Sequence, residues 1–497
     1  MKFKFPTAQT ILLLITALTV LLTWVIPAGK YETLAYTSDS NLFSFKGKEA
    51  TLNLPATQHT LDSLAIQIPL EKFTKGEIWK PINIPSTFYY IEHEPQGVAA
   101  FLKAPIKGII QASDVIFFVL ILGGAIGIMN FSGTFDAGIG TLSKILKGKE
   151  YFLVIIITVL IAAGGTTFGL AEETIAFYPI LIPIFLAARY DAMVALGSIY
   201  LGSSIGTMIS TVNPFSTIIA SNVAGINWTT GLTSRLLLLI IGTTICIVYI
   251  LWYGKKVQKD PTKSLVFNQK EAIEKQFHTS SFGLKELTTA QKVALPVFLM
   301  CFIIMIYGVS SLEWWFEEMT VVFLVGAVLL GFILKINEKT FVTEFIKGSS
   351  ELLGVALIIG IARGVSVVME EGMIIDTVLH YASSLTTGMH SGLFANMMMV
   401  IYSGLSFFIP SSSGMAVLTM PIFAPLADTV GVGREVVVDA YQLGQGLFAF
   451  INPTGLILAT LAIVNVSYDK WLRFVMPLVG ILLVVSVIYL SLISYLG

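Results

Sequence analysis

Apolar segments, each of roughly 20 residues and able to cross a bilayer as one helix, follow one another along this chain. Clear examples lie at residues 11–26, 114–131, 293–311, 319–334 and 352–370. The first has the position of a signal peptide, but it is long for one, and we favour a retained first helix. The pattern predicts an all-α polytopic membrane protein.

Two further apolar stretches, residues 192–234 and 440–468, carry no charge, and each contains an Asn-Pro pair: Asn213-Pro214 and Asn452-Pro453. Proline removes a backbone donor and clashes with the preceding turn, so each pair predicts a broken membrane helix. In lipid, such a break persists only where protein or a water-filled cavity satisfies the released backbone groups. Matching breaks in two halves of a chain indicate the binding site of a secondary transporter.

Lysines in three short connections predict which ends of the spans are cytoplasmic. Residues 255–292 contain eight lysines against four acidic residues, and two other loops carry Lys144, Lys147 and Lys149, and Lys335, Lys339 and Lys347. The positive-inside rule then places these loops and the N-terminus in the cytoplasm and residues 30–107 outside. The spans near 114–131 and 352–370 therefore cross in opposite directions.

These two oppositely directed spans begin similar series of motifs. Glycine spacing in 122–127 matches that in 359–364, and the Pro-x-x-x-Pro of 179–183 recurs at 421–425. The Asn-Pro pairs follow at nearly equal distances. We therefore predict two inverted repeats, each with a re-entrant hairpin and a span broken at Asn-Pro.

The predicted organisation has six parts. They are a first transmembrane helix (1–29), an extracytoplasmic insertion with short β runs (30–107), transport repeat 1 with hairpin 1 (108–254), a cytoplasmic loop (255–292), linking helices (293–351), and transport repeat 2 with hairpin 2 (352–497). The predicted hairpin tips are residues 164–174 and 410–414, and the stretch 279–291 is predicted to follow the cytoplasmic surface.

Composition agrees with a membrane protein and excludes other classes. The chain is 55% hydrophobic and 12% charged, whereas soluble domains carry about 25% charged residues. A net charge of -1 gives no indication of nucleic-acid binding. Cys246 and Cys301 lie in apolar segments, so we expect neither a disulfide nor a metal framework. Enzyme motifs are lacking, and we expect no catalytic residue and no cofactor beyond a coupling ion, sodium or a proton.

The first tip contains the adjacent carboxylates Glu172 and Glu173, followed by Thr174. An acidic residue within the membrane costs roughly 3 kcal/mol on insertion scales, so it indicates a cationic partner. That partner is sodium, a proton, or an amino or guanidinium group of the substrate. Alternatively, the tip reaches interfacial water and one glutamate caps the next helix.

The second tip consists of Ser411, Ser412 and Ser413 before Gly414. Hydroxyls and free amides at a helix start suit an anionic group, although an ordinary serine N-cap explains the same pattern. Asn213 and Asn452 at the breaks offer oxygens to an alkali cation or NH₂ groups to a carboxylate, unless they only satisfy the broken backbone.

Arg363 lies inside an apolar span and must face protein or water. A structural ion pair with Glu172, Glu173, Glu370 or Glu371 is favoured over a substrate carboxylate. The predicted substrate-binding residues are Glu172, Glu173, Thr174, Asn213, Ser411, Ser412, Ser413, Asn452 and Thr454, with Arg363, Thr211 and Ser216 as further partners for an ion or a substrate carboxylate.

Residues 169–179 (GLAEETIAFYP) and 210–217 (STVNPFST) resemble the YfcC/ArcD-type branch of the DcuC-like carriers, in the ion transporter superfamily. The likeness covers nearly the whole chain. It implies a bacterial inner-membrane carrier, a homodimer, and an elevator-like movement of the transport part. Members carry C4-dicarboxylates or exchange basic amino acids of the arginine/ornithine kind. Distant relatives have Ser-Asn-Thr at both hairpins, whereas this chain has Ala-Glu-Glu-Thr and Ser-Ser-Ser-Gly.

Carboxylates at one tip and hydroxyls at the other together predict an amino acid substrate, with a basic one favoured, carried by alternating access. The alternative is a sodium- or proton-coupled carrier of C4-dicarboxylates or other small carboxylates, in which the glutamates serve the coupling ion. An ion channel, which would need a continuous polar pore, is disfavoured. An intramembrane enzyme is also disfavoured, because Ser411–Ser413 have no evident histidine partner.

Overall fold

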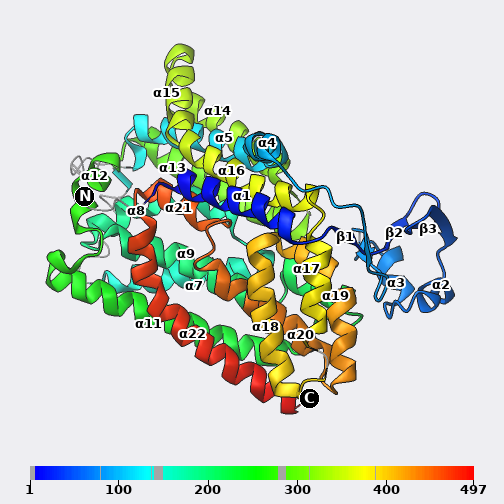
Figure 1. The fold of residues 1–497 in the computed structure, drawn as a ribbon. Helices are drawn as coiled ribbons and strands as arrows, with labels where there is room; N and C mark the ends of the chain where they lie inside the picture. The colour runs from blue at the N-terminus through cyan, green and yellow to red at the C-terminus, as the bar shows by residue number, and fades with distance from the viewer. Residues whose placement is uncertain are drawn as a thin grey trace.

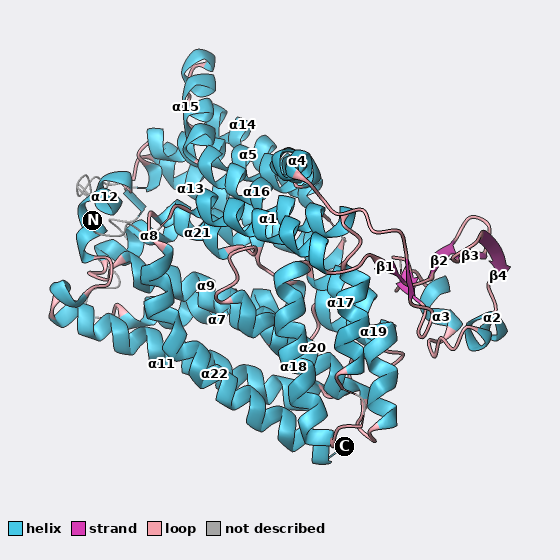
Figure 2. Cartoon of the chain, in the orientation of Figure 1, coloured by secondary structure: helices cyan, strands magenta, loops and turns pink. Residues whose placement is uncertain are grey.

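Helices make up most of the described chain, as Figure 2 shows. The computed structural model describes residues 6–78, 80–135, 137–138, 149–277, 287–312, 314–386 and 388–496. Lys144, Lys147 and most of the predicted surface stretch 279–291 lie outside these ranges.

The helices fall into a first series, a linking group and a second series. The first series is α4 (Val98–Gln111), α5 (Ser113–Phe131), α7 (Tyr151–Phe168), η1 (Glu172–Phe177), α8 (Tyr178–Ala187), α9 (Ala192–Met208), η2 (Pro214–Ile218), α10 (Ile219–Val223) and α11 (Leu232–Lys259). The linking group is α12 (Lys270–Gln276), α13 (Thr289–Ser311) and α14 (Phe316–Ile333). The second series is α15 (Glu338–Glu351), α16 (Leu353–Glu371), α17 (Ile375–Ser384), α18 (Ser391–Phe408), α19 (Ser412–Thr429), α20 (Arg434–Ala449), α21 (Ile457–Val464) and α22 (Tyr468–Leu496).

Within the described ranges, nine helices are long and apolar enough to cross a membrane. They are α1 (Ala8–Val25), α5, α7, α11, α13, α14, α16, α18 and α22. The all-α membrane fold predicted from the sequence is therefore confirmed. Helix α4 begins at Val98, so residues 98–107, which the sequence assigned to the insertion, belong to a helix.

The elements predicted as hairpins pack against both helix breaks. Helix α7 runs along α9, and α18 runs along α20. The returning helix α8 contacts α21, which follows the second break, while α19 contacts α10, which follows the first. Each hairpin thus lies on the broken helix of its own series and on the distal piece of the other.

Glycines allow close helix contacts beside these hairpins. Helix α4 packs on α16, and a Cβ on Gly108 would stand 2.2 Å from the carbonyl oxygen of Gly360. Helix α5 packs on α15, where a Cβ on Gly348 would stand 2.3 Å from the carbonyl oxygen of Gly123. Small residues at such crossings let backbones approach closely, as is usual in membrane helix packing.

Residues 29–91 form a small domain, the cap, at one end of the molecule (Figure 1). Its four-stranded antiparallel sheet has the order β4-β3-β2-β5, and β1 pairs with β6. The strands are β1 (Gly29–Lys30), β2 (Thr33–Thr37), β3 (Leu42–Lys46), β4 (Thr51–Pro55), β5 (Ile82–Asn83) and β6 (Tyr89–Tyr90), with α2 (Gln58–Ser63) and α3 (Leu70–Thr74) between them. Helix α12 lies at the opposite end (Figure 1).

Candidate functional site

The first break is held by the side chain of Asn213. Helix α9 ends at Met208 and Pro214 begins the next segment, η2, where the Asn213 Oδ1 accepts a hydrogen bond from the backbone N of Phe215 at 2.8 Å. Its Nδ2 donates to the carbonyl oxygen of Gly165 in α7 at 3.5 Å. The amide therefore caps the segment after the break and also joins it to the first hairpin, so the expected backbone-satisfying role is present.

Neighbouring hydroxyls complete this junction. The backbone N of Thr211 donates to the Thr166 Oγ1 at 2.9 Å, which ties the break to the end of α7. The Ser216 Oγ is buried and has no hydrogen-bond partner among the residues that the structure describes. A buried hydroxyl without a partner is costly, so it is a candidate to contact a solute or ion.

The first tip contains Glu172 and Glu173 in the short helix η1, after Gly169 turns the chain in a left-handed conformation (φ 79°). The Glu173 Oε2 accepts a hydrogen bond from the backbone N of Ala171 at 3.1 Å, and Thr174 donates to the Ala171 carbonyl oxygen. Glu173 is partly buried, whereas the side chain of Glu172 is exposed. Glu173 thus contacts the backbone of its own tip, and Glu172 is accessible.

The second break repeats the arrangement of the first. The Asn452 Nδ2 donates to the carbonyl oxygen of Ser406 at 3.0 Å, and its Oδ1 accepts from the backbone N of Thr454 at 3.0 Å. The Thr454 hydroxyl lies 3.2 Å from the carbonyl oxygen of Phe407. Both residues join the break to the end of α18, as Asn213 joins its break to α7.

Each serine of the second tip has a different partner. The Ser411 Oγ accepts from the backbone N of Gly414 at 3.2 Å, which is an N-cap bond of α19. The Ser412 Oγ accepts from the Gln445 Nε2 at 3.1 Å. The Ser413 Oγ accepts from the Nζ of Lys80, a residue of the cap, at 3.1 Å. The ordinary N-cap explanation therefore holds for Ser411 and leaves the other two hydroxyls with side-chain donors.

Two glutamines on α20, which sequence reasoning missed, connect the site. The Gln442 side chain donates to the Thr217 hydroxyl just after the first break, and Gln445 reaches the second tip. Positions three apart lie on one face of a helix, and amides in the uncharged part of a membrane helix are uncommon. That combination is the signal in the sequence that could have identified them. Hydrogen bonds thus link residues of the first break to the second tip through one helix.

Arg363 contacts helix α4 and a residue of its own helix α16. Its Nε donates to the Gln111 Oε1 at 3.1 Å, and its Nη2 lies 3.9 Å from the Glu370 Oε1. Glu371, another expected partner, pairs with Lys107. The predicted ion pair is therefore seen with Glu370, at long distance, and the guanidinium side chain remains 36% exposed.

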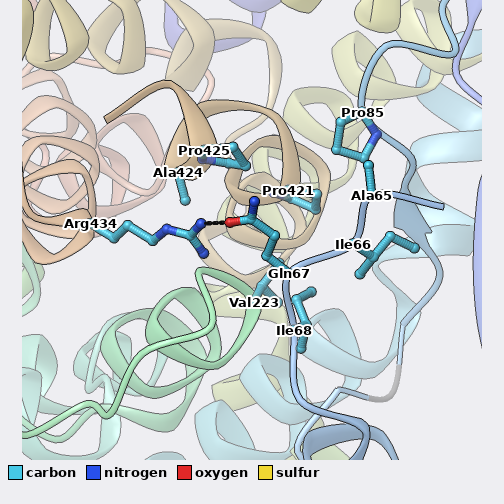
Figure 3. A pocket seen from close by; sticks show the side chains of 10 residues that line it. All are labelled: Ala65, Ile66, Gln67, Ile68, Pro85, Val223, Pro421, Ala424, Pro425 and Arg434. Atoms are coloured by element: carbon cyan, nitrogen blue, oxygen red, sulfur yellow. Dashed lines mark hydrogen bonds between the residues drawn. The ribbon is translucent and has the colours of Figure 1, made fainter. Parts of the chain in front are cut away.

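A crevice between the cap and the helices is distinct from this site (Figure 3). Its volume is only about 10 Å³, and Gln67, Pro421 and Arg434 are among its lining residues. The Arg434 guanidinium donates to Gln67 of the cap and to the carbonyl oxygen of Ala224. A space of this size holds about one water, so it serves docking of the cap and not solute binding.

Two interrupted helices, each braced by a hairpin and presenting polar groups inside an apolar bundle, define a multi-pass membrane transporter. The sequence profile of the C4-dicarboxylate anaerobic carrier family, DcuC, matches residues 5–495. The chain belongs to this family of transporters, as its motifs indicated, and it is not an enzyme.

Among relatives, an uncharacterized protein of Haemophilus influenzae is 46% identical over 492 residues, which is 98% of this chain and 96% of that protein. The putative basic amino acid antiporter YfcC of Escherichia coli is 28% identical over 509 residues, covering 98% and 95% of the two chains. Among solved structures, the YdaH transporter of Alcanivorax borkumensis (11% identity, TM-score 0.39, 98% of both chains) and MtrF of Neisseria gonorrhoeae (14%, TM-score 0.40, 98% and 95%) are similar.

Proposed function

We propose that this protein is a secondary active transporter of an amino acid, with exchange of basic amino acids of the arginine/ornithine kind as the leading case. The observation that carries the proposal is the contrast between the two tips. The first presents the carboxylates of Glu172 and Glu173, and the second presents the hydroxyls of Ser412 and Ser413. The similarity to a putative basic amino acid antiporter supports the same substrate class.

In this proposal the glutamates bind the amino or guanidinium group, because an anionic side chain in a low-dielectric site favours a cation. The second tip, with Ser412, Ser413 and Arg363, binds the carboxylate. Asn213, Asn452, Thr174, Thr211, Ser216 and Thr454 shape the site between them. The amides brace the two breaks, and the buried Ser216 hydroxyl contacts the solute or an ion.

In this proposal, alternating access results from movement of the two inverted repeats, each of which contains a hairpin. The packing of α8 on α21 and of α19 on α10 supports the repeat, because equivalent elements make equivalent contacts. An elevator-type movement, a homodimer, a bacterial inner-membrane location and a cytoplasmic N-terminus complete the proposal.

A sodium- or proton-coupled carrier of C4-dicarboxylates is the second candidate. The cations near the second tip, Lys80 and Arg363, favour it, and so does the description of the family. Here Glu172 and Glu173 would bind the coupling ion instead of the substrate.

Uptake by proteoliposomes separates the two candidates. Labelled arginine should enter vesicles preloaded with ornithine, without a sodium gradient, and labelled succinate should not. Uptake of succinate driven by a sodium or proton gradient, with no uptake of arginine, would overturn the amino acid assignment in favour of the second candidate.

Substitution Glu173→Gln removes the charge while keeping the size of the side chain, and it should lower the transport rate at least about tenfold, because a charge-assisted contact contributes roughly 1.5–3 kcal/mol. Asn213→Ala removes the amide that braces the first break, and this variant should not transport. Glu271→Gln, on the exposed helix α12, is the matched control and should transport normally. Normal transport by both Glu173→Gln and Asn213→Ala, at equal expression, would refute the site.

A further inference from the structure

Lys80 of the cap reaches the second tip, although 333 residues separate it from Ser413 along the chain. It lies between α3 and β5, and its Nζ donates to the Ser413 Oγ at 3.1 Å. Its side chain is partly buried. Covering the membrane helices does not by itself require a cation in contact with the second tip, so this contact suggests a further role for the cap.

A second cation, Arg363, repels the charge of Lys80. Burial and the nearby Arg363 guanidinium lower the pKa of Lys80 below its ordinary value. The Arg363 charge is only loosely balanced, since Glu370 is 3.9 Å away. Like charges brought together destabilise one another, and an anion between them removes that repulsion.

The position of Lys80 is held by its surroundings. Three residues further on, the Asn83 Nδ2 donates to the Asp376 Oδ1 and to the carbonyl oxygen of Leu418 in α19, both at 3.3 Å. These contacts tie this part of the cap to the helix that starts at the second tip. The lysine is therefore presented by a docked segment rather than by an unattached loop.

Other lysines of the cap behave differently. Lys72 is paired with Glu77 at 2.7 Å and also contacts Asn222. Lys75 pairs with Glu71 one helical turn away, and its side chain is 59% exposed. Both pair with a carboxylate of the cap itself, whereas Lys80 donates to a hydroxyl at the start of α19.

We propose that Lys80 is a substrate-recognition residue that the cap contributes, forming with Arg363 a cationic site for the carboxylate group of the solute at the second tip. This inference deepens the proposed function and rests on it. It holds for an amino acid and for a dicarboxylate, because both present a carboxylate to the same tip. The cap is then part of the binding pathway and not only a cover.

Charge-selective thiol labelling tests the local potential without knowledge of the substrate. Ser413→Cys, or Ser412→Cys, in the full-length protein places a thiol at the tip, and the native Cys246 and Cys301 are buried. An anionic methanethiosulfonate should react faster than a cationic one. Lys80→Gln should reduce this preference about tenfold, as expected for removal of a nearby unit charge. Lys80→Arg should keep it, and Lys75→Gln should leave it unchanged. An unchanged preference in Lys80→Gln at both positions would overturn the proposal.

Transport kinetics then test recognition of the carboxylate. For whichever of labelled arginine and succinate the wild type carries, Lys80→Gln should raise KM about tenfold or more, as for loss of a charge-assisted hydrogen bond. The maximal rate should change little. If arginine is carried, agmatine, which lacks the carboxylate, should inhibit Lys80→Gln as strongly as it inhibits the wild type. A structural role would instead lower the maximal rate and the folded amount with KM unchanged, and that result contradicts the inference. Failure of the wild type to carry either solute counts against the proposed function, while the labelling result still decides the role of Lys80.

Discussion

Asn213 and Asn452 show how a single amide can serve two purposes at a broken helix. In both residues the Oδ1 accepts a backbone N–H two residues later, and the Nδ2 reaches the end of the hairpin helix. The carboxamide therefore replaces bonds that proline removes. This leaves the nearby hydroxyls and the glutamates of the first tip as the groups best placed to meet a solute.

Gly169→Ala tests how closely Asn213 must fit. A Cβ at Gly169 would stand 2.8 Å from the Asn213 Nδ2, and the φ of +79° is unfavourable for alanine. The left-handed conformation costs about 1–2 kcal/mol, and the methyl group displaces the amide. We expect transport to fall at least about tenfold with a small decrease in the melting temperature. Gly404→Ala, where a Cβ would meet nothing within 4 Å, should behave as wild type. Equal transport by the two variants would show that the position of Asn213 does not matter.

Contacts between helices connect the two breaks. Helix α20 leads into the second break, yet its glutamines contact Thr217 after the first break and Ser412 at the second tip. The helices α9 and α20 also approach closely, since a Cβ on Gly446 would stand 2.3 Å from the Cβ of Met208. A shift of α20 therefore changes both breaks at once.

The cap is docked on α17 through Asp376, and Asp376→Ala tests this contact. The carboxylate accepts from the backbone N of Tyr31 at 3.1 Å and from the Asn83 Nδ2 at 3.3 Å. Removing it leaves two donors without their acceptor, at a cost of about 1–3 kcal/mol each. We expect faster hydrogen exchange and proteolysis within residues 29–91, while the membrane helices stay protected. Asp62→Ala, on the exposed surface of α2, is the control. Unchanged exchange in Asp376→Ala would mean that other contacts hold the cap.

For the molecule as a whole, the cap and α12 lie at opposite ends (Figure 1). Tyr489 near the end of α22 contacts Ser234 near the start of α11, which agrees with antiparallel crossing of these two long helices. The lysine-rich segment 255–292 contains α12, so the positive-inside rule predicts that α12 is inside and the cap outside.

Labelling of intact cells tests that orientation. Lys75→Cys in the cap should react with a membrane-impermeant thiol reagent, whereas Lys270→Cys in α12 should react only after the membrane is opened. The two lysine side chains are 59% and 56% exposed, so a difference in labelling reports the side of the membrane and not burial. The opposite pattern of labelling would reverse the proposed topology.

Much of the architecture follows from local properties of the chain. Apolar length predicted the spans, proline predicted both breaks, and the motifs around Glu172 and Asn213 indicated the family, because each depends on neighbouring residues only. Other facts depend on contacts between distant segments. The partner of Arg363, the bridging role of Gln442 and Gln445, and the reach of Lys80 to Ser413 are set by how the helices and the cap pack. A single sequence does not reveal such contacts, since residues hundreds of positions apart meet only when the folded chain brings their helices together.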